Sequence, residues 1–332
     1  MRRAAPPRAP AREPSSASAS SASTGFEALP DSVESQFLFR WAPPRFHPFL
    51  QLARLDRPIG WWLLLLPCWW SSALASISQR APLHWRDLAL FFAGAVVMRG
   101  AGSTYNDIAD RKIDAKVART KGRPLASGRV GVKGALFFLA AQCLGGLAVL
   151  LNFNAVTIAM GFASLGAVAL YPFMKRVTSF PQAVLGMAFA WGALVGWPAV
   201  TGSLALAPVL LYLGAVFWTI GYDTIYAVQD IEDDALAGIG SSALFFGPHL
   251  RRGVAGLYAA SAIFMEAALA SAHTGLLAQA GLFLFALHLA WQALRLDPAD
   301  GVMALRLFRS NRNAGLLLFG GLAADVLSGT AL

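Results

Sequence analysis

The sequence predicts an all-α, polytopic membrane protein, a bundle of nine transmembrane helices. Of its 332 residues, 56% are hydrophobic and only 14% are charged, whereas soluble domains carry about 25% charged residues. Apolar stretches long enough to cross a bilayer core of ~30 Å recur along the chain, and Lys and Arg gather in alternate connections between them. Frequent glycines inside these stretches suit close helix packing in lipid, so a bundle is expected rather than a barrel.

Each predicted span is close to the length of about 17 to 20 residues that a membrane helix requires. In chain order the spans are 59–78, 88–105, 134–151, 155–171, 184–200, 209–227, 253–272, 276–294 and 314–332. Together they make residues 46–332 one membrane domain.

The basic residues test this division independently, because Lys and Arg should gather in every second connection if the spans alternate in direction. The stretch before the first span and the connection between the second and third spans are rich in Lys and Arg. Later connections on the same side add further basic residues, including those between 294 and 314. The other side collects only Arg80 and Arg86, in the first connection. The amino terminus is therefore predicted to lie on the positive side.

Residues 1–45 differ in composition from the rest of the chain. Their first part combines several arginines with many Ala and Ser and a single acid, Glu13. This is typical of an organellar transit peptide followed by a disordered segment, and the apolar core of a secretory signal is missing. The alternative is a disordered cytosolic tail.

Composition also argues against two other kinds of site. The formal charge of +9 comes from residues placed between apolar runs rather than on one basic face, so nucleic-acid binding is not expected. Cys68 and Cys143 are the only cysteines, and both lie inside apolar runs. They support neither a disulfide framework nor a cysteine metal site.

Two acidic stretches border the apolar runs, at the ends of the second and sixth predicted spans. Charge is costly at membrane depth, so acids in these places are candidates for function. Steps of four and seven residues put the acids of each stretch on one stripe of a helix, on the basic side of the membrane. The first stripe contains Asn106, Asp107, Asp110 and Asp114, and the second contains Asp223, Asp230 and Asp234.

Such rows of like charge are unfavourable unless a cation lies among them. Carboxylate and amide oxygens are the ligands of hard ions such as Mg²⁺, and the stripes contain no His or Cys that would favour zinc. With the α-helical rise of ~1.5 Å per residue, Asp223 and Asp230 lie ~10 Å apart along the helix axis, too far for the two carboxylates to hold one ion. Two ions bridged by a diphosphate would satisfy both stripes. The alternative is that the acids only pair with the neighbouring basic loop.

Basic residues near the acids are candidates for binding phosphate or carboxylate groups. Arg99 lies two turns before Asn106 inside an apolar run, where an unpaired guanidinium would be expensive. Cations of the second-to-third connection could neutralise a leaving diphosphate, or they could only set topology. The predicted substrate-binding residues are Arg54, Arg57, Arg99, Arg123, Arg129, Lys175 and Arg176.

The two acidic stretches, NDIADRKID at 106–114 and DTIYAVQDIEDD at 223–234, resemble the paired motifs of the UbiA prenyltransferase superfamily. Supporting strings are LDRPIG at 55–60, RPLASG at 123–128 and YPFMKR at 171–176. The similarity runs from about residue 47 to the carboxyl end. It is greatest to the branch that prenylates 4-hydroxybenzoate in ubiquinone biosynthesis.

The resemblance implies a central cavity that opens sideways to lipid and is capped by the two motif-bearing loops. It implies Mg²⁺ held by both stripes, with polyprenyl diphosphate and 4-hydroxybenzoate as substrates and the bilayer as solvent for the prenyl tail. Asp223 is expected to accept the ring proton, and Arg54 and Asp110 complete the predicted catalytic residues. Arg54, Lys175 or Arg176 would bind the acceptor carboxylate. Association with other proteins of ubiquinone biosynthesis is compatible with this role.

The amino-terminal extension resembles the mitochondrial targeting region of eukaryotic members of the superfamily. The expected location is therefore the mitochondrial inner membrane, with the motif loops on the matrix side. If the transit-peptide interpretation is wrong, we expect a bacterial-type plasma membrane with these loops on its cytoplasmic face.

Two rival functions remain open at the level of sequence. An ion-coupled transporter also carries intramembrane acids, although its acids usually lie near the midplane within paired repeats of broken helices. A prenyltransferase for another acceptor, such as homogentisate, dihydroxynaphthoate or haem, would carry the same acidic stripes. Magnesium-dependent release of pyrophosphate separates the first rival from an enzyme, and analysis of products from several acceptors separates the second.

Overall fold

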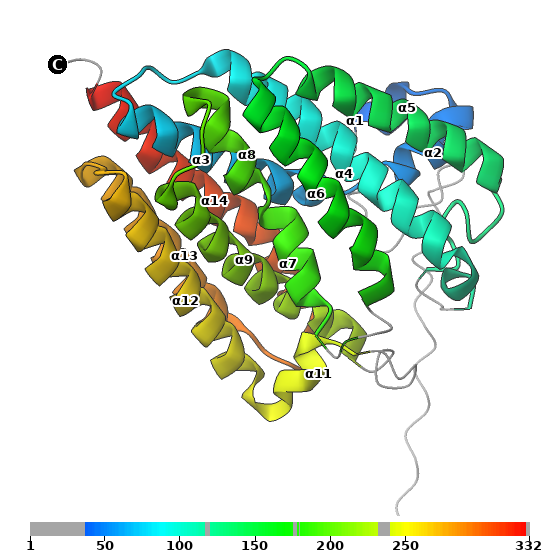
Figure 1. The fold of residues 1–332 in the computed structure, drawn as a ribbon. Helices are drawn as coiled ribbons and strands as arrows, with labels where there is room; N and C mark the ends of the chain where they lie inside the picture. The colour runs from blue at the N-terminus through cyan, green and yellow to red at the C-terminus, as the bar shows by residue number, and fades with distance from the viewer. Residues whose placement is uncertain (1–36, 117–119, 175–177, 179, 232–239, 330–332) are drawn as a thin grey trace, which may run out of the picture.

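The computed structural model describes residues 37–116, 120–174, 178, 180–231 and 240–329. These residues form helices joined by loops, with no β-strand among them. The long helices run side by side in a slanted bundle (Figure 1). The predicted all-α class is therefore confirmed for this part of the chain.

Three short elements precede the bundle, namely α1 (Phe37–Trp41), the 3-10 helix η1 (Pro44–Phe46) and α2 (His47–Leu52). The first half of the bundle consists of α3 (Ile59–Ser78), α4 (Trp85–Asp114), α5 (Val132–Leu150), α6 (Ala155–Met174), α7 (Gln182–Ala190) and α8 (Gly192–Thr201). The second half consists of α9 (Leu206–Tyr226), η2 (Ala227–Asp230), α11 (Ser242–Phe246), η3 (Gly247–His249), α12 (Leu250–Ser271), α13 (Leu276–Arg295) and α14 (Gly301–Gly329).

Within the described residues, seven helices are long and apolar enough to cross a membrane, judged by length and composition. Four of them are the single helices α3, α4, α5 and α13. The other three each join consecutive elements, namely α7 and α8, then α9 and η2, and then α11, η3 and α12. The other two predicted spans, 155–171 and 314–332, fall on α6 and α14. The apolar part of α6 is shorter, Ala155–Leu170, and α14 is not among the seven. The chain is thus a multi-pass membrane protein, and the number nine stays a prediction.

Two helices differ from their predicted form. The fifth predicted span is interrupted at Trp191, which separates α7 from α8. The last helix begins at Gly301, well before the predicted start at 314, so the stretch that contains Arg306, Arg309 and Arg312 is helical rather than a loop. Arginine is a good helix former with a long aliphatic stem, so a basic stretch can extend a membrane helix beyond its apolar part.

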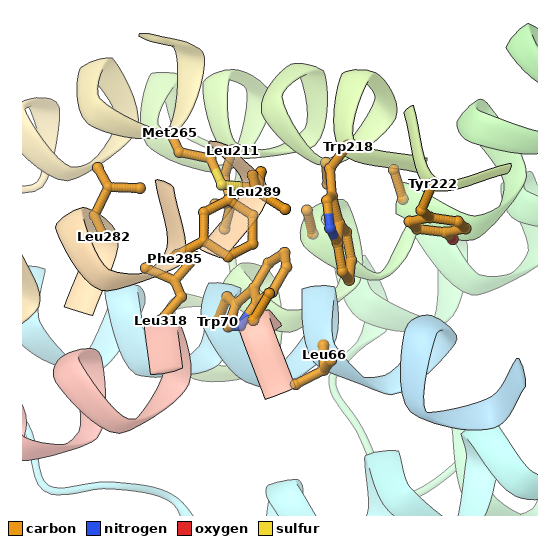
Figure 2. Packing of buried hydrophobic residues seen from close by; sticks show 14 of the residues in the cluster. Leu66, Trp70, Leu211, Trp218, Tyr222, Met265, Leu282, Phe285, Leu289 and Leu318 are labelled. Atoms are coloured by element: carbon orange, nitrogen blue, oxygen red, sulfur yellow. The ribbon is translucent and has the colours of Figure 1, made fainter. Parts of the chain in front are cut away.

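The main hydrophobic core lies where α3, α9, α13 and α14 meet (Figure 2). The Trp70 ring centroid lies 4.9 Å from that of Trp218 and 5.8 Å from that of Phe285. Trp70 Nε1 donates to the Gly315 carbonyl at 2.9 Å, and Trp218 Nε1 donates to Asn311 Oδ1 at 2.8 Å. Both indole N–H groups are thus satisfied inside the bundle, as a water-free interior requires.

Candidate active site

A cavity of about 1600 Å³ runs through the bundle and is lined by α3 to α9 and by α14. Most of its charged lining residues come from the last turns of α4, the end of α9 with η2, the first half of α14 and nearby loops, whereas Arg99 lies in the middle of α4. The rest of the lining is mostly apolar. The charged lining residues are Arg54, Arg57, Arg99, Asp110, Asp114, Arg123, Asp223, Asp230, Arg309 and Arg312. The cavity therefore has a charged end and an apolar end.

The predicted first stripe lies on the last turns of α4. Asp107, Asp110 and Asp114 are all buried, and Asn106, Asp110 and Asp114 line the cavity. Asp107 is the exception, since it is 1% exposed and is not part of the lining. Three of the four predicted oxygen ligands of this stripe thus face the cavity directly.

Two arginines neutralise the acids of α4. Asp107 Oδ1 accepts hydrogen bonds from Arg54 Nη2 at 2.7 Å and from Arg123 Nη1 at 3.2 Å. Arg123 Nη1 also donates to Asp114 Oδ2 at 2.9 Å. The pairing of acids with nearby basic residues, considered as an alternative from sequence, is therefore realised for Asp107 and Asp114. Because Arg54 and Asp107 are both buried, removing either of them leaves an uncompensated charge and costs about 3–5 kcal/mol.

Arg54 is held at the cavity wall by its own backbone and by a second hydrogen bond. Its φ of +55° lies in the left-handed region that residues other than glycine rarely adopt. Its Nη1 donates to the Gln51 carbonyl at 2.9 Å. These constraints keep the guanidinium beside the acids of α4.

Arg99 of α4 lies deeper in the apolar part of the chain, as predicted. Its guanidinium carbon lies 5.5 Å from the centroid of the Phe189 ring, and its Nη1 donates to Ser103 Oγ. A Cβ atom at Gly60 would lie only 2.5 Å from Arg99 Nε, so a glycine at this position leaves room for the side chain. A cation–π contact and a hydrogen bond make this half-buried cation tolerable.

The second acidic stretch reaches the same cavity from the other side of the bundle. Asp223 near the end of α9 and Asp230 at the end of η2 both line the cavity. The assumed regular α-helical spacing is incorrect, because α9 ends at Tyr226 and the backbone tightens into a 3-10 helix before Asp230. Asp234, Lys175 and Arg176 lie outside the described residues.

Arg57 and Arg129, two further predicted ligands, differ in position. Arg57 lines the cavity, and its Nε lies 3.4 Å from Oδ2 of the buried Asp56. Burial raises the pKa of the Asp56 carboxyl, while the charges of Arg57 and Arg54 oppose this shift. Arg129 is exposed and is not part of the lining, since its guanidinium donates to Ser127 Oγ and to the Gly122 carbonyl within its own loop.

Sequence reasoning missed three charged residues of this region. Arg309 and Arg312 of α14 line the cavity, although the sequence pattern assigned them to a topology-setting loop. Asp56 belongs to the LDRPIG motif at 55–60, but it was not predicted to be a site residue. A three-residue step between Arg309 and Arg312, which places both on one helical face, is the signal that could have found the α14 pair.

The residues present fit a magnesium site that substrate completes. Asn106 Oδ1 and Asp107 Oδ2 are buried and have no hydrogen-bond partner among the described residues. Within the same residues, no three His, Cys, Asp or Glu side chains are close enough to hold a metal by themselves. Mg²⁺ commonly binds one or two carboxylates together with substrate phosphates and waters, which suits such a partial site.

Comparison with known proteins agrees with this architecture. Residues 64–317 match the UbiA prenyltransferase family, so the chain belongs to this family of membrane enzymes. The chain is 46% identical over 292 residues to the mitochondrial 4-hydroxybenzoate polyprenyltransferase of Rattus norvegicus, covering 88% of this chain and 78% of that protein. It is 43% identical over 284 residues to the Homo sapiens enzyme of the same name, covering 85% and 76%.

Solved structures share the fold. The apo structure of a UbiA homolog from Aeropyrum pernix K1 superposes with a TM-score of 0.66 at 27% identity, over 80% of this chain and 97% of that chain. A UbiA homolog from Archaeoglobus fulgidus, whose structure contains GPP and Mg²⁺, superposes with a TM-score of 0.59 at 17% identity, over 86% and 100%. The second likeness establishes the fold alone.

Proposed function

We propose that this protein transfers a polyprenyl chain from polyprenyl diphosphate to 4-hydroxybenzoate, at the ring carbon ortho to the hydroxyl, in ubiquinone biosynthesis. The observation that carries this proposal is the 46% identity to a 4-hydroxybenzoate polyprenyltransferase over 88% of the chain. The divided cavity supports it, because a substrate with a charged head and an apolar tail matches a charged end joined to apolar walls.

The charged end is the proposed site of the diphosphate. Asn106, Asp110 and Asp114 line the same cavity as Asp223 and Asp230, and they are the proposed magnesium ligands together with Asp107 and Asp234. When bound, Mg²⁺ withdraws charge from the diphosphate as a Lewis acid. Arg57 and Arg123 lie in the same wall and add fixed positive charge where the leaving diphosphate becomes more negative.

The transfer itself breaks the allylic C–O bond, and its electron pair leaves with the diphosphate. The ring carbon ortho to the phenol hydroxyl forms the new C–C bond, and its proton passes to a carboxylate, proposed to be that of Asp223. Apolar lining residues exclude the water that would otherwise capture the allylic cation. Arg54, Lys175 or Arg176 is the proposed partner of the acceptor carboxylate, by charge complementarity, and Arg99 is a further proposed substrate-binding residue.

We further propose nine membrane spans, with α6 and α14 completing the seven, and a mitochondrial inner-membrane location with the charged end on the matrix side. The mitochondrial names of the relatives support this location. Residues 1–45 are the proposed transit peptide and disordered segment. Residues 1–36 lie outside the described residues, whereas 37–45 contain α1 and the start of η1 and are therefore not a disordered segment. Association with other ubiquinone-biosynthesis proteins belongs to the same proposal.

A product assay tests the proposed reaction. Purified protein in lipid nanodiscs receives Mg²⁺, a polyprenyl diphosphate and a panel of acceptors that includes 4-hydroxybenzoate, homogentisate and dihydroxynaphthoate. Mass spectrometry should detect 3-polyprenyl-4-hydroxybenzoate together with one pyrophosphate per product. A prenylated product from another acceptor alone would reject the proposed substrate, and ion transport without pyrophosphate release would reject the enzyme class.

A further inference from the structure

One buried hydroxyl in the cavity wall lacks a hydrogen-bond partner. Tyr222 of α9 is 2% exposed and lines the cavity, and its Oη meets no donor or acceptor within the part of the chain that the structure describes. Thr219, one helical turn earlier, is close enough to act on this hydroxyl, but its Oγ1 is likewise buried and without a hydrogen-bond partner there. An unpaired hydroxyl is costly inside a membrane bundle, so a ligand that pairs with Tyr222 Oη would remove this cost.

A second buried tyrosine nearby shows the usual arrangement. Tyr258 of α12 is buried and is not part of the cavity lining, and its hydroxyl donates to Gln292 Oε1 at 2.7 Å. Its ring packs against the residue before Tyr222, because a Cβ atom at Gly221 would lie 2.4 Å from Tyr258 Cε1. The two tyrosines therefore occupy one region of the bundle and differ in whether the protein itself satisfies the hydroxyl.

The surroundings of Tyr222 are aromatic. Figure 2 shows its ring beyond Trp218, and the two ring centroids lie 5.0 Å apart with the ring planes at 82°. The Phe308 ring centroid lies 5.8 Å from that of Tyr222 and 4.6 Å from that of Tyr226. Tyr222, Tyr226 and Phe308 all line the cavity, so this part of its wall consists of aromatic rings. The edges and faces of such rings are a favourable packing surface for an aromatic ligand.

Two charged cavity residues, Asp223 and Arg99, act electrostatically on the Tyr222 hydroxyl. The aromatic acceptor has two polar groups, a carboxylate and a phenol hydroxyl, on opposite sides of its ring. The reacting carbon is ortho to the hydroxyl, and its proton is proposed to pass to Asp223, so the hydroxyl belongs near Asp223 and the carboxylate far from it. A neutral hydroxyl also avoids the repulsion that a carboxylate would meet beside Asp223. The phenol hydroxyl is therefore the group that fits Tyr222.

We propose that Tyr222 binds the phenol hydroxyl of the acceptor and thereby selects acceptors that carry a hydroxyl next to the reacting carbon. This inference rests on the proposed function, which supplies the acceptor. The phenol O–H donates to Tyr222 Oη. As the ring carbon bonds to the prenyl chain, positive charge spreads to the phenol oxygen, so its O–H becomes a stronger donor and the hydrogen bond strengthens in the transition state. The ring proton passes to the carboxylate, and Tyr222 neither gains nor loses a proton.

The two tyrosines provide a matched test, because Tyr222→Phe and Tyr258→Phe each remove one oxygen atom from a buried ring. Calorimetry in nanodiscs, with Mg²⁺ and an unreactive thiolodiphosphate analogue of geranyl diphosphate, gives the Kd of 4-hydroxybenzoate and of benzoate, which lacks the hydroxyl. The wild type and Tyr258→Phe should bind 4-hydroxybenzoate about tenfold more tightly than benzoate. In Tyr222→Phe this preference should disappear, and kcat/KM for the prenylation of 4-hydroxybenzoate should fall about tenfold or more.

Thermal unfolding without ligands distinguishes a binding role from a structural one. Tyr258→Phe should have a lower midpoint than the wild type, because Gln292 Oε1 loses a buried hydrogen-bond donor. Tyr222→Phe should have a midpoint equal to or above that of the wild type, because it removes a buried hydroxyl that has no partner among the described residues.

The outcomes separate the inference from the proposed function. A hydroxyl preference in Tyr222→Phe equal to that of the wild type would overturn the inference, as would a wild type that binds benzoate and 4-hydroxybenzoate equally well. A clearly lower midpoint in Tyr222→Phe would also overturn it, because the hydroxyl would then be bonded within the protein. A wild type that neither binds 4-hydroxybenzoate nor prenylates it would instead reject the proposed function.

Discussion

The two sides of the bundle differ in how tightly they are packed. In α3, 67% of the most apolar stretch is buried inside the protein, whereas in α5 the corresponding share is 17%. α3 packs on α4, α8, α9 and α14, while α5 has α4 as its main partner. One side is therefore a packed scaffold, and the other is a loose wall around the cavity.

The acidic stretches belong to different sides of this comparison. Asp223 lies near the end of α9 and Asp230 at the end of η2, and α9 packs closely on α12. Asp107 and Asp110 lie on α4, which is the main packing partner of α5. A diphosphate with its ions would therefore join the two sides at the charged end. The packed side carries one half of the charged end, and the loosely packed side carries the other half.

The largest expected effect is on the packed side. Trp218→Ala should destabilise the protein by about 3–5 kcal/mol, because it leaves a cavity in the core and removes the hydrogen bond to Asn311 Oδ1. Thermal unfolding in detergent should show a clearly lower midpoint than wild type and than the Trp218→Phe control. A midpoint equal to that of the wild type would mean that this side is not the scaffold.

Helix positions and the location of most of the acids could be predicted from sequence, because both rest on simple local patterns. The apolar stretch 59–78 has the same bounds as α3. Asn106, Asp110, Asp114, Asp223 and Asp230 all line the cavity, because helical spacing and the expense of buried charge are strong constraints.

Other features depend on contacts that no local pattern contains. Asp107 turns to Arg54 and Arg123, which are 53 and 16 residues away in the chain. The break between α7 and α8 and the 3-10 helix before Asp230 leave the apolar pattern unchanged, so hydropathy does not reveal them. Arg309 and Arg312 were assigned to a loop because a basic stretch between spans usually sets topology.

The next prediction concerns the charged end. Asp107→Asn keeps the volume and an acceptor for Arg54 but removes the negative charge. We expect kcat/KM to fall by about 10²–10³-fold, the range measured when one electrostatic group of an active site is lost. The thermal midpoint should fall as well, because Arg54 and Arg123 lose the buried charge that they pair with. Asp230→Ala should behave similarly. Wild-type turnover in either variant at saturating Mg²⁺ would remove these acids from the site.

The smallest effect distinguishes two arginines of one loop. Arg123 contacts Asp107 and Asp114, whereas Arg129 contacts only groups of its own loop among the described residues. Arg123→Lys should lower kcat/KM about tenfold, because lysine keeps the charge but not the planar guanidinium that hydrogen-bonds to Asp107 and Asp114. Arg129→Lys should change kcat/KM less than about twofold, as an exposed substitution does. Similar values for both variants would refute the distinction drawn between them.

The central claim is that divalent ions dock a diphosphate between the acids of α4 and those at the end of α9 and in η2. The most direct measurement is the rate of 3-polyprenyl-4-hydroxybenzoate formation in nanodiscs after chelation with excess EDTA, followed by titration with Mg²⁺. The account predicts that the rate falls to background and returns as Mg²⁺ is restored, with no return in Asp107→Asn. An undiminished rate in EDTA would contradict it.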